Sequence, residues 1–127
     1  MPILHVRALP QKDSSKITPA LKKTILAISE TYGCSPHQVW ATWEEIKSGW
    51  YVEGENEASE QPLETHPPIC ELTCFEGRTS EEVEKLLEVA ASTLSKELGI
   101  KDNIFMTYKE AKSGQVIAGN GIVRKKD

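Results

Sequence analysis

The sequence predicts an α+β fold in which two duplicated β-α-β units form a four-stranded mixed sheet with two helices on one face. Three observations predict it: an internal repeat, two helical segments that each end at a glycine, and a β-prone stretch before each helix. The segments TWEEIKSGWYVEG (42–54) and TYKEAKSGQVIAG (107–119) match in one register at Thr, an aromatic residue, Glu, Lys-Ser-Gly and a closing Gly. Such a repeat indicates two copies of one supersecondary unit, each of which needs the other to cover its apolar face.

The repeat also predicts how the domain is organised. Working back from each copy, Gly33 pairs with Gly99, the strand PILHV with PICEL, and Pro2 therefore with Pro68. We expect a single domain over residues 1–127, made of repeats 1–54 and 67–121 that are joined by the acidic surface connector ENEASEQPLETH (55–66). A chain of 127 residues is long enough to bury one core without disulfides or structural metal.

The first unit is expected to begin with a strand over 3–9, followed by a helix. Its apolar helix positions step by three or four residues, as in an amphipathic helix: Ile17, Leu21, Ile25, Ile28 and Tyr32. Ser14 or Ser15 is expected to cap the helix start, and Gly33 to end the helix.

The second unit repeats this pattern. The corresponding apolar positions of its helix are Val83, Leu87, Ala90, Leu94 and Leu98. Thr79 and Glu82 have the spacing of a capping box, and Gly99 is expected to end the helix as Gly33 ends the first.

The order of elements predicts the connections and leaves one sheet face without helices. A strand, a crossover helix and a second strand of this length imply a right-handed connection with the two strands parallel. The helix-free face is expected to be covered by other subunits, because four aromatic residues fall in the strands and hairpins that build it: Trp40, Trp43, Trp50 and Phe105.

Composition excludes several classes of function. The net charge of −4 argues against a nucleic-acid binder or a protein held on anionic membranes. No basic stretch followed by an apolar run opens the sequence, and no apolar run has the length of a membrane span, so we expect a cytoplasmic protein. The three cysteines and three scattered histidines show no metal-ligand spacing, so neither a metal nor a cofactor is expected.

Four features together resemble the tautomerase superfamily, the group of 4-oxalocrotonate tautomerase and macrophage migration inhibitory factor. They are a proline after the initiator methionine, the β-α-β repeat, the EGR entering a helix in FEGRTSEE (75–82), and a Gly-rich hairpin after the second strand. The resemblance covers nearly the whole chain. The two-unit length resembles the trimeric, double-length branch, which implies a homotrimer.

The resemblance implies that Pro2 is a general base. Removal of Met1 leaves a free secondary amine that can take a proton from carbon next to a carbonyl and return it elsewhere. An α-amino group has a pKa near 8, and an apolar pocket or a nearby cation would lower that pKa toward the operating pH. Pro68 cannot act in this way because its nitrogen lies within the chain as a tertiary amide.

By the same resemblance, Arg78 serves the proline of the other repeat. It precedes the Thr79 cap, where its guanidinium and the positive end of the helix dipole can hold a carboxylate or a developing enolate. The pseudo-equivalent Lys12 is a weaker match, since lysine lacks the planar fork of arginine. The alternative interpretation of Arg78 is a solvated charge near a helix start.

The departures from the family define the expected pocket. Trp40 and Phe105 stand where 4-oxalocrotonate tautomerase has its second arginine, and Phe75 stands where the family's dehalogenases have one. Ala118 replaces the dehalogenases' water-activating glutamate, so hydration and dehalogenation are not expected. With Tyr51 at the family's pocket phenylalanine, the substrate pocket is expected to consist of aromatic side chains suited to a monoacid with a hydrophobic tail: Trp40, Tyr51, Phe75 and Phe105. Interface packing is the alternative for Trp40, Tyr51 and Phe105.

The sequence therefore favours a keto–enol tautomerase that acts on a small carboxylate, a 2-oxo or 2-hydroxy-dienoic acid, with Pro2 as base and Arg78 as carboxylate anchor. The alternative is a non-catalytic tautomerase-fold protein that serves as a binding or assembly module. The missing second arginine supports this alternative.

Overall fold

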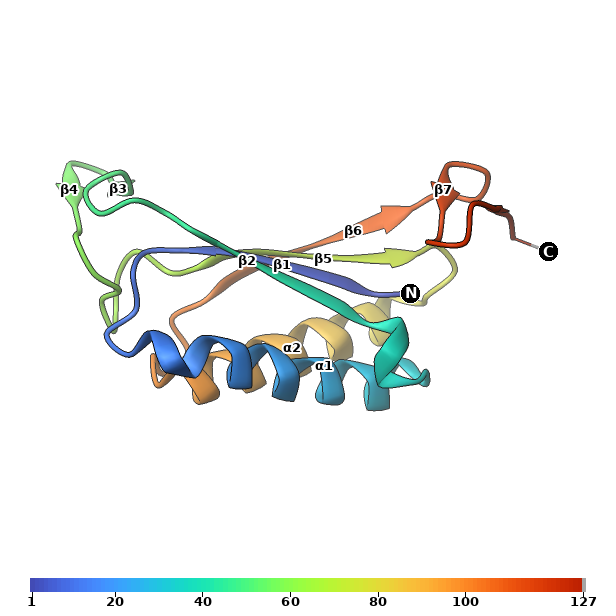
Figure 1. The fold of residues 1–127 in the computed structure, drawn as a ribbon, viewed down its shortest axis with the longest axis horizontal. Helices are drawn as coiled ribbons and strands as arrows, with labels where there is room; N and C mark the ends of the chain where they lie inside the picture. The colour runs from blue at the N-terminus through green and yellow to red at the C-terminus, as the bar shows by residue number, and fades with distance from the viewer. Residues whose placement is uncertain (127) are drawn as a thin grey trace.

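The computed structural model describes residues 1–126 and shows a four-stranded sheet with both long helices on one face (Figure 1). The sheet has the order β2-β1-β5-β6, with β1 parallel to β2, β5 parallel to β6, and β1 antiparallel to β5. Its strands and helices are β1 (Ile3–Ala8), α1 (Ile17–Tyr32), β2 (Trp40–Glu45), β5 (Ile69–Phe75), α2 (Ser80–Leu98) and β6 (Phe105–Ala111). The predicted fold class is confirmed.

Two small hairpins rise at opposite ends of the sheet, on the side away from the helices (Figure 1). One pairs β3 (Val52–Glu53) with β4 (Asn56–Glu57), and the other pairs β7 (Val116–Ile117) with β8 (Val123–Arg124). Short 3₁₀ turns precede α1 and β2: η1 (Ser14–Lys16) and η2 (Pro36–Gln38).

The helix termini were predicted correctly at the C-terminal ends of both helices and wrongly at the start of α1. Gly33 and Gly99 both adopt left-handed backbone at the helix C-termini, with φ of 86° and 71°, so these predicted ends are confirmed. The start of α1 was predicted wrongly. Asp13, and neither Ser14 nor Ser15, provides the side-chain cap: it accepts from Ser15 N at the start of the 3₁₀ turn η1 that precedes the helix, whereas Lys16, the N-cap residue of α1 itself, makes no capping bond.

The capping box of α2 supports a stability prediction. Thr79 Oγ1 accepts from Glu82 N at 3.2 Å, and the Glu82 carboxylate accepts from Thr79 N at 2.9 Å. Thr79→Ala removes the first bond and should lower the free energy of unfolding by about 1 kcal/mol. Urea denaturation measures this loss, with Ser80→Ala as the control. Equal midpoints for Thr79→Ala and Ser80→Ala would contradict the prediction.

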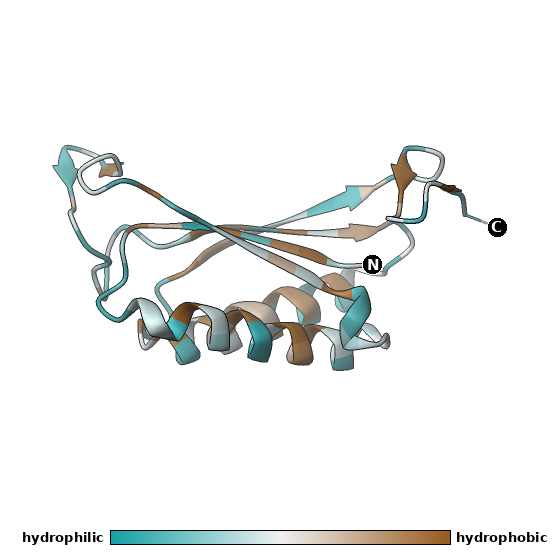
Figure 2. Ribbon diagram, viewed as in Figure 1, coloured by the Kyte–Doolittle hydropathy of each residue, from teal (hydrophilic) through white to brown (hydrophobic). Residues whose placement is uncertain are grey.

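The core lies between the sheet and the helices. Alternate residues of β1 and β5 point into it, which Figure 2 shows as hydrophobic stretches of the central strands, whereas the turn from β1 into α1 is hydrophilic. Small residues of α1, Ala20 and Thr24, are fully buried, while Leu21 and Ile25 pack at the edge of the core. Part of the predicted apolar stripe of α1 therefore faces the edge of the core and not its centre. The buried Thr24 hydroxyl donates a hydrogen bond to Ala20 O at 2.8 Å.

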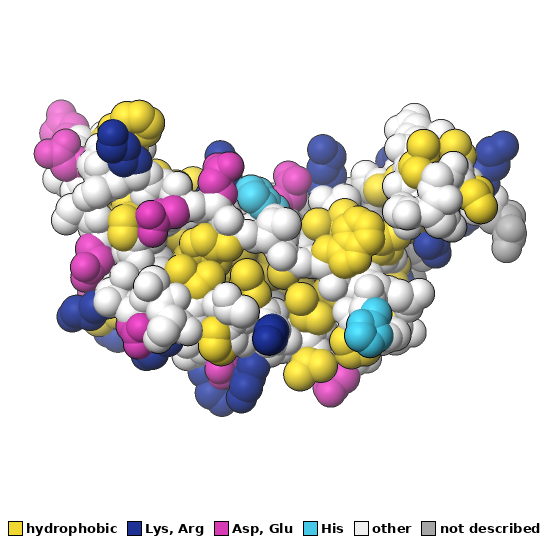
Figure 3. All heavy atoms as spheres, in the orientation of Figure 1, with side chains coloured by type: hydrophobic (Ala, Val, Ile, Leu, Met, Phe, Trp, Pro, Cys, Tyr) yellow, Lys and Arg dark blue, Asp and Glu magenta, His cyan; other side chains and the backbone are white. Residues whose placement is uncertain are grey.

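One of the four aromatic residues expected on the helix-free face, Trp43, does not lie there. Trp43 packs against the core on the helix side, because residues 40 and 43 are an odd number apart and so point to opposite faces of β2. The middle of the helix-free face is polar, where His5 pairs with Thr42 on one side and Glu71 on the other. Trp40 and Phe105 are exposed on this face where β2 and β6 begin, and further exposed hydrophobic side chains lie on the two hairpins (Figure 3): Trp50, Val52, Ile117, Ile122 and Val123.

The segment 55–66 is tied to the first hairpin. Its residues 56 and 57 form β4, and His66 at its end is buried, with 3% of its surface exposed. The His66 Nε2–H donates to Asn56 O at 2.7 Å, and His66 N donates to the Glu53 carboxylate at 3.1 Å. Within residues 1–126, no helix combines the length and apolarity that crossing a membrane requires.

Candidate active site

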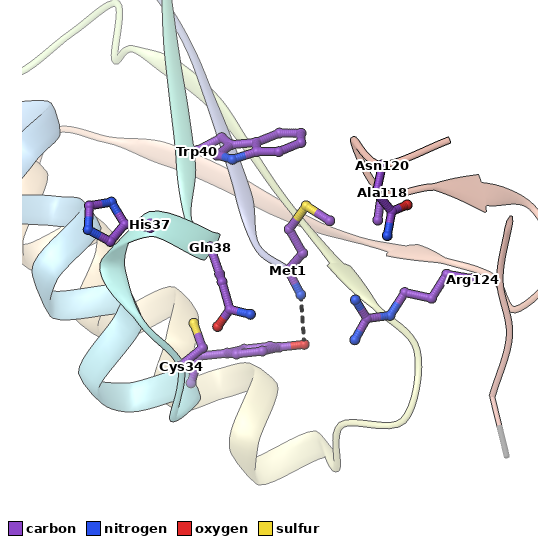
Figure 4. Close-up of a pocket in the computed structure, with 9 residues that line it drawn as sticks. Met1, Cys34, His37, Gln38, Trp40, Ala118, Asn120 and Arg124 are labelled. Carbon is purple, nitrogen blue, oxygen red and sulfur yellow. Dashed lines mark hydrogen bonds between the residues drawn. The ribbon is translucent and has the colours of Figure 1, made fainter. Parts of the chain in front are cut away.

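A cavity of about 360 Å³ surrounds the amino terminus (Figure 4). It is lined by Met1, Tyr32, Cys34, His37, Gln38, Trp40, Ala118, Asn120 and Arg124. None of these nine residues is acidic, although the chain as a whole has 19 acidic and 15 basic residues. The cavity thus combines a terminal amine, a guanidinium, amide groups and a flat aromatic side chain, which suits a small anion.

The two halves of the chain build this cavity together. Tyr32 is the last residue of α1, and Trp40 opens β2, where its backbone N–H donates to Pro2 O at 3.0 Å. The opposite wall comes from the C-terminal hairpin. A Cβ added at Gly119 would lie 3.5 Å from the Trp40 ring, so this hairpin approaches Trp40 closely.

The terminal amine is held where its charged form is disfavoured. Met1 N donates to the Tyr32 hydroxyl at 3.3 Å (Figure 4). Burial lowers the pKa of this amine, and the positive charges of Arg124 and Arg78 lower it further. An amine in this place is therefore a better base at neutral pH than an ordinary amino terminus.

Pro2 itself is fully buried while Met1 precedes it. Its nitrogen is then an amide, and its carbonyl accepts the Trp40 N–H that starts the pairing of β1 with β2. Because Pro2 follows Met1 directly, removal of Met1 would leave the free amine of Pro2 next to the cavity that the Met1 amine now occupies.

Arg78 reaches the amino-terminal region from the second unit. Its guanidinium carbon lies 3.6 Å from the centroid of the Tyr32 ring, and its Nη1 lies 3.5 Å from a Glu82 carboxylate oxygen. Arg78 therefore contacts the ring of the tyrosine whose hydroxyl accepts from the Met1 amine. It does not itself line the cavity.

The predicted aromatic pocket is divided between the two ends of the sheet. Trp40 lines the cavity, and Phe75 lies under the guanidinium of the lining residue Arg124, with 5.1 Å from Arg124 Cζ to the ring centroid. Phe105 lies at the other end, where its N–H donates to Pro68 O at 3.0 Å as Trp40 does to Pro2 O.

Tyr51 lies at the Pro68 end as well. Its hydroxyl donates to Pro67 O at 2.7 Å, and its ring meets His66 edge-on. Within one chain the structure therefore brings Arg78, Trp40 and Phe75 to the amino terminus, and it does not bring Tyr51 and Phe105 there.

Several residues of the site were missed from the sequence, Arg124 and Tyr32 among them. Arg124 follows the second repeat and has no counterpart in the first, so the duplication gave no signal for it. Tyr32 was assigned to the apolar stripe of α1, and no pattern indicated that its hydroxyl meets the amine. Among residues 1–126, no group of three or more His, Cys, Asp or Glu side chains is placed to hold a metal ion.

Comparison with known proteins gives a match in structure only. No protein-family model matches the sequence, and no curated protein matches it. The crystal structure of Pt0534 inactivated by 2-oxo-3-pentynoate superposes with a TM-score of 0.82 at 17% identity, over 95% of this chain and 94% of that one. The symmetric trimer of wild-type fused 4-OT gives 0.81 at 17% identity over the same shares.

A third similar structure is the macrophage migration inhibitory factor of Toxoplasma gondii, with a TM-score of 0.68 at 13% identity, over 93% of this chain and 96% of that one. Each of these superpositions covers nearly the full length of both chains. The chain therefore has the tautomerase fold in its double-length form, as the sequence resemblance implied.

Proposed function

We propose that this chain is a keto–enol tautomerase, an isomerase that acts on a 2-oxo or 2-hydroxy-dienoic acid. In this proposal Pro2, freed by removal of Met1, is the general base, and Arg78 stabilises negative charge on the substrate. The observation that carries it is the position of the amino terminus, which lies in a partly buried cavity with a lowered amine pKa, an arginine and no acidic lining residue.

The chemistry needs one group that takes and returns a proton. The neutral secondary amine of Pro2 accepts the proton of the substrate's enol hydroxyl and becomes an ammonium. The same nitrogen then returns a proton to the substrate carbon, so that the 2-oxo acid forms and the amine is neutral again. A base with a pKa near the operating pH performs both halves of this transfer efficiently.

The residues that line the cavity favour an unsaturated, planar acid as substrate. Trp40 offers a flat apolar surface, and the cationic groups favour a carboxylate. Tyr51 and Phe105 stand at the other end of the sheet, so in this proposal they contact a substrate at Pro2 only from a neighbouring subunit.

We further propose a homotrimer. Wild-type fused 4-OT forms a symmetric trimer, and this chain exposes hydrophobic side chains on both hairpins, among them Trp50 with 73% and Ile122 with 66% of their surface exposed. Hairpins that project from the sheet present these side chains to other subunits, where burial would stabilise the assembly.

The trimer is tested by its mass in solution. Light scattering at micromolar concentration should give three times the chain mass of 14.1 kDa. Ile122→Asp should lower that mass, because it places a charge in the buried interface. Leu26→Asp is the control, since Leu26 is an exposed apolar residue of α1 away from both hairpins. A monomeric wild type, or dissociation by Leu26→Asp alone, would contradict the trimer.

Catalysis is tested in three steps. Intact mass first establishes that Met1 is absent, and the rate of ketonisation of the phenylpyruvate enol is then measured. Incubation with 2-oxo-3-pentynoate, which inactivates Pt0534, should add one mass equivalent to the amino-terminal peptide. Protein with a free Pro2 that shows neither activity nor an adduct would favour the non-catalytic binding module instead.

A further inference from the structure

Arg124 is the only arginine or lysine among the described residues that line the cavity at the amino terminus. It belongs to β8, whose pairing with β7 places Arg124 opposite Val116, and its carbonyl accepts from Gly114 N at 2.8 Å. The backbone that carries this side chain is therefore fixed by the hairpin.

The guanidinium of Arg124 is also held in place. It lies over the Phe75 ring, and in Figure 4 it points into the cavity toward the Met1 amine. No carboxylate within residues 1–126 lies at ion-pair distance from Arg124, whereas Arg78 has Glu82 as a partner. Its hydrogen-bond donors are thus directed at the space that a ligand would fill.

The opposite wall sets the orientation of that ligand. Gly119 of the same hairpin approaches the Trp40 ring, so Trp40 and Arg124 face one cavity from two sides. An acid that stacks on Trp40 can direct its carboxylate to Arg124 while its carbon chain lies beside the amine.

We propose that Arg124 binds the substrate carboxylate in this cavity and determines the preference for acids over neutral analogues. The inference rests on the proposed function for the identity of the substrate, but not for the binding of a carboxylate. Arg78, which lies over the Tyr32 ring and outside the cavity lining, then acts on the charge that develops during the reaction.

The test uses a matched pair of unreactive probes, phenylacetate and phenylacetamide, which differ in charge and little in shape. Binding is followed by the shift of the Trp40 indole N–H signal in NMR spectra, assigned with Trp40→Phe. Wild type should bind phenylacetate more tightly than the amide. Arg124→Gln, which keeps a polar stem over Phe75, should weaken phenylacetate about 10- to 100-fold and leave the amide unchanged.

Two further variants separate charge from structure. Arg124→Lys should recover part of the acid preference, since it restores the charge without the planar fork. Lys125→Ala removes a neighbouring cation that does not line the cavity, and it should bind both probes as wild type does.

The inference would be overturned if wild type did not prefer the acid, if Arg124→Gln kept the preference, or if it weakened both probes equally. These measurements require no turnover and no free Pro2. Acid binding through Arg124 in a protein without tautomerase activity would refute the proposed function alone, and activity without this preference would refute the inference alone.

Discussion

Pro2→Ala is expected to lower kcat/KM for the enol of a 2-oxo acid about 10²- to 10⁴-fold, the usual contribution of a general base. The variant keeps a terminal amine, but that amine is primary, more flexible and differently placed. Steady-state ketonisation of the phenylpyruvate enol measures the loss, after intact mass has shown that Met1 is absent from both proteins. Far-UV circular dichroism and light scattering should show the fold and assembly of wild type.

The chain provides a matched control for this variant. Pro68 is the pseudo-equivalent proline, it is fully buried, and its carbonyl accepts the Phe105 N–H as that of Pro2 accepts the Trp40 N–H. Its nitrogen lies within the chain and cannot act as a base, so Pro68→Ala should retain the wild-type rate. An equal loss in both variants would mean that proline acts through the structure of the strands, and unchanged activity in Pro2→Ala would exclude Pro2 as the base.

The pH profile follows from the surroundings of the amine. Burial lowers the pKa of the Met1 amine most, Arg124 and Arg78 lower it further, and the nearby Cys74 and Cys34 act in the opposite direction. The Pro2 amine, next to the same groups, should also have a pKa below that of an ordinary terminal amine. Since the neutral amine is the base, kcat/KM should fall as the pH drops through this lowered pKa. Removal of the Arg124 charge should move the fall to higher pH.

The fold could be predicted from the sequence because its signals are local and occur twice. Two copies of one motif, two glycines at helix ends and one capping box indicate the same architecture, and agreement between such signals makes an assignment secure. The direction of individual side chains was predicted less well. Trp43 was assigned to the wrong sheet face although its spacing from Trp40 decides the face, and close packing turned Leu21 and Ile25 of α1 away from the centre of the core.

The candidate site could be predicted only in part because it combines segments that are far apart in sequence. Arg78 meets Tyr32 across the interface of the two units, and Arg124 enters from a hairpin beyond the repeat. No periodicity relates these positions to the amino terminus. Tyr51 and Phe105 are aromatic, as expected for residues of the substrate pocket, but they lie near Pro68 at the opposite end of the sheet.

Arg78→Ala is expected to lower kcat/KM for a carboxylate enol. The loss of transition-state stabilisation should be roughly 1.5–3 kcal/mol, the value of a hydrogen bond to a charged group. Arg78 lies over the Tyr32 ring and outside the cavity lining, so the loss should fall mainly on kcat if it stabilises the developing enolate. A loss mainly in KM would indicate that it binds the carboxylate of the ground state.

Lys12→Ala and Glu82→Gln are the controls for this prediction. Lys12 is the exposed pseudo-equivalent cation of the first unit, and its removal should not change the kinetics. Glu82→Gln removes the ion-pair partner at 3.5 Å while Arg78 keeps its place over Tyr32, so most of the activity should remain. If Arg78→Ala retains the wild-type kcat/KM, or if Lys12→Ala loses as much, Arg78 is a solvated charge at a helix start and the stabilising cation of the proposed tautomerase must be sought elsewhere.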